Sequence, residues 1–125
     1  MSRVISATAA TVITMAALPS ASKASTPGVT GNDWLHLCES KNDVDAARCF
    51  TFARSVADTL IFMREADKAI PACIPVEADA NQLVDLGVQF MVAHTKERHH
   101  GAASLLAYAF WDAFPCDEAN KPTKQ

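Results

Sequence analysis

The chain has 125 residues, which leaves room for one domain, and a formal net charge of −3. This acidic balance disfavours nucleic acid and anionic lipid as partners, and it favours a basic partner. Half of the residues are hydrophobic, so a core can be buried, although a chain of this length builds only a modest one.

Residues 1–24 have the composition of a secretory signal. One basic residue precedes the uncharged run 4–18, and a proline and small residues follow it, in the order of the three regions of a signal peptide. Ser22 and Ala24 fit the two small subsites of the signal peptidase, so the sequence predicts cleavage after Ala24. A second site lies after Ala21.

A retained membrane anchor is the alternative to a cleaved signal. The fifteen residues 4–18 include four Ser or Thr and fall short of the roughly 20 apolar residues that a span needs. The best later candidate, 102–111, is ten residues long, so no membrane span is predicted. Cleavage leaves the single exported domain 25–125, which has nine basic and 14 acidic residues and a net charge of −5.

The cysteines all lie after the signal, at Cys38, Cys49, Cys73 and Cys116. An even number of cysteines in an exported chain predicts two disulfides. A zinc site is the alternative, but zinc sites favour cysteine pairs separated by about two to four residues. Here the gaps are ten, 23 and 42 residues, so we predict disulfides and no metal site.

Helical spacing of apolar residues predicts the first two helices. The first covers 31–39, with Thr30 as N-cap and Asp33 three positions later, where an acidic side chain suits the positive helix end. The second and longest runs from about Asp43, which can cap it, to Asp67, and the prolines that follow prevent its continuation.

The third and fourth helices follow a proline-rich loop. The third begins at Asp79, which has capping-box spacing to Gln82. The polar segment 95–101 interrupts the pattern, and the fourth helix covers 102–114. The polar residues 117–125 predict a disordered tail. No segment alternates with the period of a strand, so the predicted fold is an all-α bundle of about four helices.

Helix order also predicts the disulfide pairing, because short loops make neighbouring helices antiparallel. If the second helix runs upward, Cys49 lies low and Cys73 lies at the top. The third helix then descends, and the fourth returns Cys116 to the top. We predict the pairs Cys38–Cys49 and Cys73–Cys116, worth about 3 and about 4 kcal/mol in loop-closure entropy; the crossed pairings would need a kinked second helix.

The sequence shows no catalytic or cofactor-binding constellation. His94, Glu97, His99 and His100 are close together, but they form no H-E-x-x-H motif. Adjacent histidines near a helix start more often cap the helix, hydrogen-bond or face water. A Cys–His nucleophile is excluded if both disulfides form, because no thiolate remains. We therefore expect neither an enzyme nor a cofactor.

Several motifs resemble those of one family when they are taken in order. They are GNDWL followed by Cys38, CFTFARSVAD at 49–58, CIP at 73–75, QLV at 82–84, AHT with RH at 93–99, and AFPC at 113–116. The set is similar to the motifs of the Rap/Tai-type immunity proteins and covers essentially the whole exported domain. The chain departs from the family at Phe52 for Tyr, Ser55 for Gly and Thr95 for Pro. Ser55 matters most, because it adds bulk where a helix packs closely or a partner binds.

The resemblance implies a periplasmic immunity protein. Family members are helical and often dimeric, and they bind and block cell-wall amidase effectors that type VI secretion delivers. They act by plugging the papain-like Cys–His cleft of the effector. For this chain, the resemblance implies a cell-wall hydrolase as partner, a homodimer and no catalytic activity of its own.

A plug of this kind has to be exposed and rigidly held. The turn 95–101 fits, because it lies between two packed helices at the end of the bundle away from the Cys73–Cys116 pair. The partner-binding residues that we predict in it are Lys96, Glu97, Arg98, His99 and His100. An ordinary solvated turn is one alternative, and a second is that His99 caps the fourth helix and contacts no partner.

Two other functions compete with immunity. A small periplasmic acid-stress or chaperone-like protein without a dedicated effector is the first. Its basis is composition, since four His and 14 acidic residues would change the charge strongly between about pH 7 and pH 3. An enzyme that uses His94, Glu97 and His99 is the second, and the missing motifs argue against it.

Overall fold

The computed structural model describes residues 28–117. Within this range it contains four α-helices, one short 3₁₀-helix and no strand beyond two isolated bridges. The elements are α1 (Gly31–Glu39), α2 (Asp43–Ala66), α3 (Ala80–Ala93), η1 (Thr95–Glu97) and α4 (Ala102–Ala113). The all-α prediction is confirmed. The predicted signal 1–24 and nearly all of the predicted tail lie outside the described residues.

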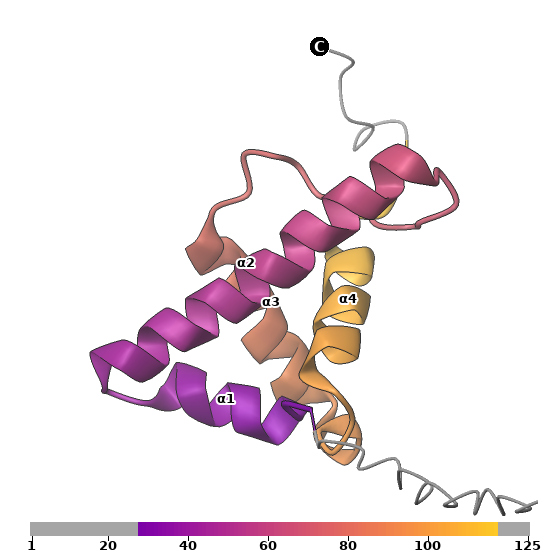
Figure 1. Ribbon diagram of the computed structural model, residues 1–125. Helices are drawn as coiled ribbons and strands as arrows, with labels where there is room; N and C mark the ends of the chain where they lie inside the picture. Colours follow the sequence, from indigo (N-terminus) through magenta and orange to yellow (C-terminus); the bar gives the residue numbers. More distant parts are fainter. Residues whose placement is uncertain (1–27, 118–125) are drawn as a thin grey trace, which may run out of the picture.

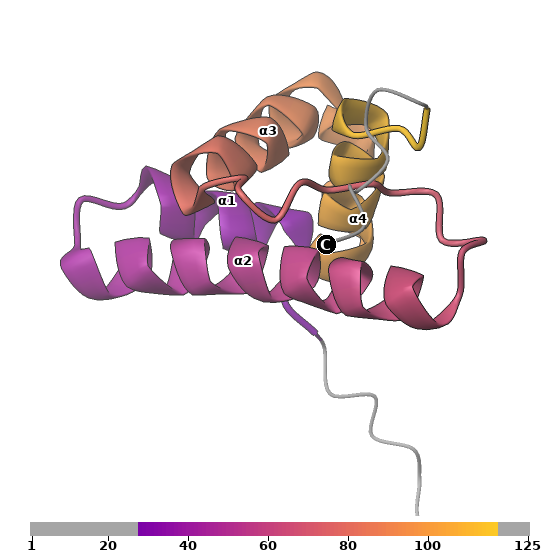
Figure 2. The same ribbon diagram turned by 90° about the horizontal axis from the view of Figure 1, so that it is seen from above.

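The four helices pack around one core, and each contacts the other three. In Figure 1, α2 crosses the front of the molecule, α1 meets its N-terminal end, and α4 stands beside its C-terminal half. Figure 2 shows α2 along one side and α3 on the opposite side. No helix within residues 28–117 combines the length and the apolar character that crossing a bilayer requires.

Side-chain caps start three of the helices. Thr30 and Asp33 form a reciprocal capping box on α1: the Asp33 N–H donates to Thr30 Oγ1 at 3.2 Å, and the Thr30 N–H donates to Asp33 Oδ2 at 2.9 Å. Asp79 caps α3 by accepting from the Gln82 N–H at 3.0 Å. Both caps were predicted from the sequence.

The predicted cap of α2 was wrong by one residue. Asn42 is the N-cap, and its Oδ1 accepts from the backbone N–H groups of Val44 and Asp45 at 2.9 and 3.2 Å. Asp43 is instead the first helical residue, where its charge still complements the helix dipole. Asn and Asp are about equally good caps, so the sequence alone does not separate the two positions.

Trp34 of α1 forms the centre of the core. Its side chain is fully buried, and its indole Nε1 donates to the carbonyl of Cys49 on α2 at 3.2 Å. The opposite edge of the ring lies against Gly87 of α3. A Cβ at Gly87 would lie 2.4 Å from Leu106 Cδ2 and 2.7 Å from Trp34 Cη2. The glycine therefore lets three helices meet around one indole ring.

Both disulfides have the predicted pairing. Cys38–Cys49, here called the α1–α2 disulfide, links residues 11 apart at the corner where α1 turns into α2. Cys73–Cys116, here called the α4 disulfide, links residues 43 apart and holds the end of α4 against the loop before α3. The Cys73 N–H also donates to the carbonyl of Phe114 at 2.8 Å. This contact follows from the antiparallel order on which the prediction was based.

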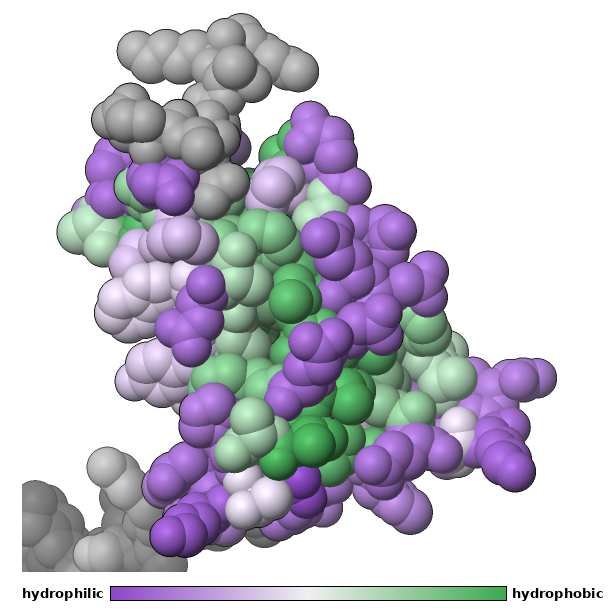
Figure 3. Space-filling model, turned by 180° about the vertical axis from the view of Figure 1, so that it is seen from behind, coloured by the Kyte–Doolittle hydropathy of each residue, from purple (hydrophilic) through white to green (hydrophobic). Residues whose placement is uncertain are grey.

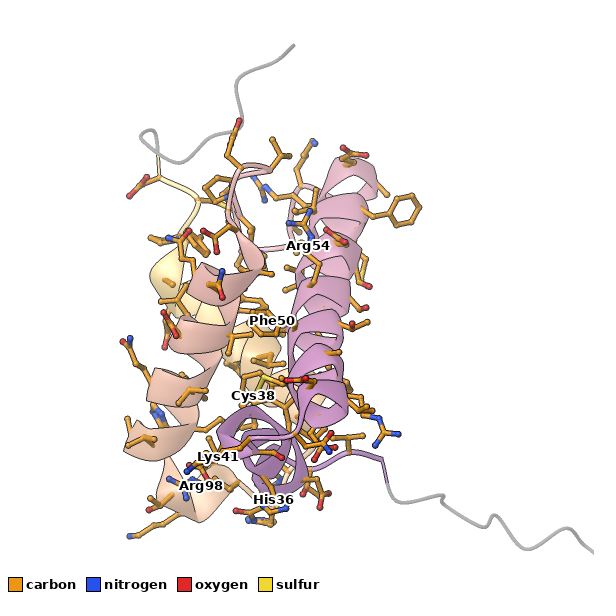
Figure 4. All side chains as sticks on the ribbon, turned by 90° about the vertical axis from the view of Figure 1, so that its left-hand side faces the viewer. His36, Cys38, Lys41, Phe50, Arg54 and Arg98 are labelled. Atoms are coloured by element: carbon orange, nitrogen blue, oxygen red, sulfur yellow. A yellow bond between two sulfur atoms is a disulfide. The ribbon has the colours of Figure 1, made fainter. Side chains whose placement is uncertain are left out.

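Two arginines of α2 hold the loop between α2 and α3. Arg54 Nη1 donates to the carbonyl of Ala78 at 3.1 Å, and Figure 4 shows it reaching from the upper half of α2 towards this loop. Arg64 Nη1 donates to the carbonyls of Lys68, at 2.8 Å, and Ile70. The loop thus has fixed ends although it contains no regular structure.

Candidate partner-binding site

The turn that joins α3 to α4, residues 95–101, is bonded to the start of α1. The Gly31 N–H donates to the carbonyl of His100 at 2.9 Å, and the Asn32 N–H donates to the carbonyl of Arg98 at 3.0 Å. These are N–H groups of the first helical turn, which have no partner inside their own helix. The α3–α4 turn therefore satisfies them and is itself held in one conformation.

Arg98 has a structural role in this turn. Its Nε donates to the carbonyl of Met91 at 2.6 Å, and the residue is half-buried. Figure 4 places Arg98 beneath the C-terminal end of α3. The bond satisfies one of the last carbonyls of α3, which lack helical partners. Among the predicted partner-binding residues, Arg98 is thus the one whose side chain holds the turn against α3.

The other predicted residues of the turn are exposed. Glu97 Oε2 lies 3.1 Å from His100 Nε2. His99 Nδ1 lies 2.9 Å from the carbonyl oxygen of Lys96. The helix α4 has Gly101 at its N-cap and receives no side-chain hydrogen bond there. The alternative in which His99 caps α4 is therefore wrong, because its ring bonds within the turn instead.

A pocket of about 430 Å³ lies between the turn and the first half of α4. We call it the turn pocket, and its lining residues are Phe90, Glu97, His100, Gly101, Ser104, Leu105 and Tyr108. The side chains of Glu97 and His100 are 51% and 55% exposed, and Tyr108 is 55% exposed. The pocket thus combines apolar walls with a carboxylate, an imidazole and a phenol at positions that a partner can reach.

Figure 3 views the molecule from the α3 side. Apolar side chains form a band through the middle of this face, and hydrophilic side chains lie on both sides of it. The half-buried residues of α3 that pack against the core are Val84, Leu86, Val88 and Phe90. Phe90 therefore belongs both to the periphery of the core and to the wall of the turn pocket.

A second surface runs along α2 and α4. Three hollows of about 440, 500 and 150 Å³ adjoin one another there, because neighbouring hollows share Phe52, Ser55, Leu60 or Ala107. We call this surface the α2–α4 face. Its remaining lining residues are Val29, Leu37, Val44, Ala47, Arg48, Thr51, Val56, Thr59, Ile70, Pro71, Ala72, Ala103, Ser104, Tyr108 and Trp111. Among the residues that line these hollows, Arg48 is the one with a charged side chain.

Ser55 lies on this face, where the family motif has glycine. Its side chain is exposed and lines two of the hollows. Close packing of another helix on Ser55 is therefore not the reason that a small residue stands there. The other explanation that the sequence offered, a partner contact at Ser55, stays a prediction.

The histidines and cysteines that the sequence analysis considered as metal ligands or catalytic groups do not come together in one site. His94 is the exposed C-cap of α3, and its ring stacks on Phe90 with the centroids 4.0 Å apart. The four cysteines all form disulfides. Among residues 28–117, no group of three or more His, Cys, Asp or Glu side chains is arranged to hold a metal ion.

Comparison with known families shows which family the chain belongs to. The family model described as Rap1a immunity proteins matches residues 30–116. The chain belongs to the Rap1a immunity protein family. The match begins at the N-cap of α1 and ends at the second cysteine of the α4 disulfide, so it spans the four helices and the turn. Neither the curated proteins nor the solved structures contain a match to the chain.

Family membership confirms the resemblance found in the sequence and supports a role as an effector immunity protein. An immunity protein acts by binding an effector partner, and proteins of this family are in general not catalysts. For the Rap1a-type chain described here, the functional question is therefore which surface meets the effector. The turn with its pocket and the α2–α4 face are the two candidates that its structure offers.

Proposed function

We propose that this Rap1a-type protein binds and inhibits a peptidoglycan amidase effector of a type VI secretion system in the periplasm. The observation that carries the proposal is the family match, which spans the domain from the first cap to the last disulfide. Two features support the compartment: residues 1–24 have the order of an export signal, and paired cysteines are typical of oxidising compartments.

The α3–α4 turn is the surface that we propose enters the effector's cleft. It projects exposed Lys96, Glu97, His99 and His100. The backbone of the turn is bonded to α1, and the side chain of Arg98 bonds the turn to α3. A segment already held in its bound conformation loses little entropy on binding, and this raises affinity. Because these bonds hold the turn in place, the four exposed side chains are not needed to pack the core.

Inhibition of a cognate amidase tests the function directly. The oxidised protein should form a stoichiometric complex with its cognate Cys–His amidase and should stop that enzyme from cleaving purified peptidoglycan. An amidase that remains fully active in the presence of excess immunity protein would refute the proposal. Isolation of the complex from a periplasmic extract, rather than from cytoplasm, tests the compartment.

A double variant tests the turn as the contact surface. Replacing Lys96 and Glu97 with Ala should weaken binding by more than about 2 kcal/mol, the size of a binding hot spot, or roughly 30-fold in Kd. Arg98 is kept, because its loss would disturb the turn itself. Glu39→Ala/Lys41→Ala is the matched control, since it removes the same two charges from exposed positions at the other end of α1. Equal affinity of both variants would move the contact away from the turn.

We also propose that a second copy of the chain covers the α2–α4 face. Two copies of an acidic protein repel each other, and this face has one charged side chain, Arg48, among the residues of its hollows. Exposed Trp111 lines the smallest of the three hollows. A projecting aromatic ring within an apolar face suits the self-complementary contact of a two-fold dimer.

Sedimentation equilibrium tests the dimer. Ala107→Glu places a charge in two of the hollows and should convert dimer to monomer. Val76→Glu puts the same charge on an exposed loop residue and should leave the dimer intact. A wild-type protein that sediments as a monomer at high concentration would contradict the assignment. If the effector covers the α2–α4 face instead, the face will be shielded from solvent only in the complex with the effector.

The acid-stress alternative gains no support from the positions of the histidines. A protein that opens on acidification needs ionisable groups that are buried while neutral. His36, His94, His99 and His100 are all exposed, so none of these four histidines is a buried group of that kind.

A further inference from the structure

We infer that the turn pocket accepts a basic side chain, lysine or arginine, from the effector. This inference rests on the proposed function, because Glu97 and His100 belong both to the turn and to the pocket beside it. It adds to that function the chemistry of one contact on the partner. Insertion of the turn would bring the side chains at the rim of the effector's cleft to the mouth of this pocket.

The walls of the pocket suit a long side chain with a cationic end. Phe90 and Leu105 provide apolar surface, against which lysine and arginine can lay their methylene groups. Tyr108 adds an aromatic ring that is 55% exposed, and a cation near such a ring is attracted to its face. A volume of about 430 Å³ is large enough for such a side chain.

Glu97 supplies the negative charge. Its Oε2 lies 3.1 Å from His100 Nε2, and a carboxylate offers about four lone-pair sites, so a second donor can bind beside the imidazole. Within residues 28–117, Glu97 forms an ion pair with His100 and with neither of its sequence neighbours Lys96 and Arg98. Arg98 is bonded to the carbonyl of Met91 on α3, and Lys96 is exposed to water.

Other classes of side chain fit less well. An apolar side chain would cover the Glu97 carboxylate without giving it a hydrogen-bond donor, and burial of an unpaired charge is costly. An acidic side chain would face the same carboxylate with like charge. The net charge of −3 over the chain also favours a basic partner surface. A cationic side chain is therefore the occupant that both the walls and the charge select.

Two small probes separate charge from shape. N-acetyl-arginine amide should shift the backbone amide NMR signals of Glu97, His100, Ser104 and Tyr108 at millimolar concentration. N-acetyl-citrulline amide has nearly the same shape without the charge and should leave those signals in place. Glu97→Gln should abolish the response to arginine, whereas Asp112→Asn, an exposed carboxylate at the other end of α4, should preserve it. Equal shifts with both probes, no shift with arginine, or a response that survives Glu97→Gln would overturn the inference.

The same variant with the cognate amidase separates this inference from the proposed function. Glu97→Gln should weaken the complex at least about tenfold, the usual cost of losing a hydrogen bond between charged groups, at an unchanged melting temperature. If the wild type inhibits the amidase and Glu97→Gln inhibits it equally well, the pocket inference fails and the immunity function stands. If no amidase is inhibited although arginine binds through Glu97, the function fails and the cation-binding pocket stands.

Discussion

Substitution of Gly87 by alanine is the sharpest test of how the core is packed. A methyl group at this position would meet Leu106 Cδ2 at 2.4 Å and Trp34 Cη2 at 2.7 Å. Neither neighbour can swing into solvent, because both side chains are fully buried. The indole is also held at its other edge by the hydrogen bond to Cys49. The helices α1, α3 and α4 must therefore separate slightly to admit one carbon atom.

Two opposing effects set the size of the change. Overpacking of a well-packed core costs about 1–3 kcal/mol, while replacement of a mid-helix glycine by alanine returns up to about 1 kcal/mol of helix propensity. The expected net loss in the free energy of unfolding is about 1–2 kcal/mol. For a domain of this size, that loss lowers Tm by roughly 5–10 °C.

Urea unfolding of the oxidised protein, followed by tryptophan fluorescence and near-ultraviolet circular dichroism, measures this loss. Gly28→Ala is the matched control, because a Cβ there has no heavy atom within 4 Å and the residue lies before the first helix; its stability should change by less than about 0.5 kcal/mol. A Gly87→Ala variant with the wild-type midpoint would mean that Trp34 and Leu106 repack freely. The account of three helices meeting closely around one ring would then be incorrect.

Three further predictions concern the disulfides, the first cap and processing. Replacement of both cysteines of one disulfide by serine should lower the free energy of unfolding by about 4 kcal/mol for the α4 disulfide and by about 3 kcal/mol for the α1–α2 disulfide. The difference arises because the two disulfides close separations of 43 and 11 residues. A larger loss for the α1–α2 disulfide in urea unfolding would contradict this. The side-chain and backbone hydrogen bonds from Thr30 lower the pKa of Asp33, so its contribution to stability is present above its unfolded pKa of about 3.9 and is lost as the pH falls through the folded value. Asp33→Asn should therefore reduce the loss of stability as the pH falls. A variant with the same dependence of stability on pH as the wild type would show that Asp33 is not its cause. Mass spectrometry of the exported protein should show a chain that begins at Ser25 and has no alkylatable thiol, and a full-length product would disprove processing.

The sequence by itself determined the features that depend on hydrogen bonds between residues close together in the chain. Thr30 with Asp33, and Asp79 with Gln82, define their helix starts within three residues, so the starts of α1 and α3 are readable without the rest of the chain. The disulfide pairing followed from one further rule, that short loops make helices antiparallel. Even the error at the start of α2 is local, since Asn42 and its neighbour Asp43 are both good N-cap residues.

The candidate site depended on tertiary structure, because its residues come from separate elements. Phe90 of α3 and Tyr108 of α4 meet beside Glu97 only once the two helices are packed. Tyr108 lies off the apolar stripe of α4, and this was the one sign in the sequence that it would face outward. The structural role of Arg98 was not predictable either, since its partner is a backbone carbonyl seven residues away. Backbone carbonyls are the same in every residue, so which of them is left without a helical partner near an arginine is decided by the fold.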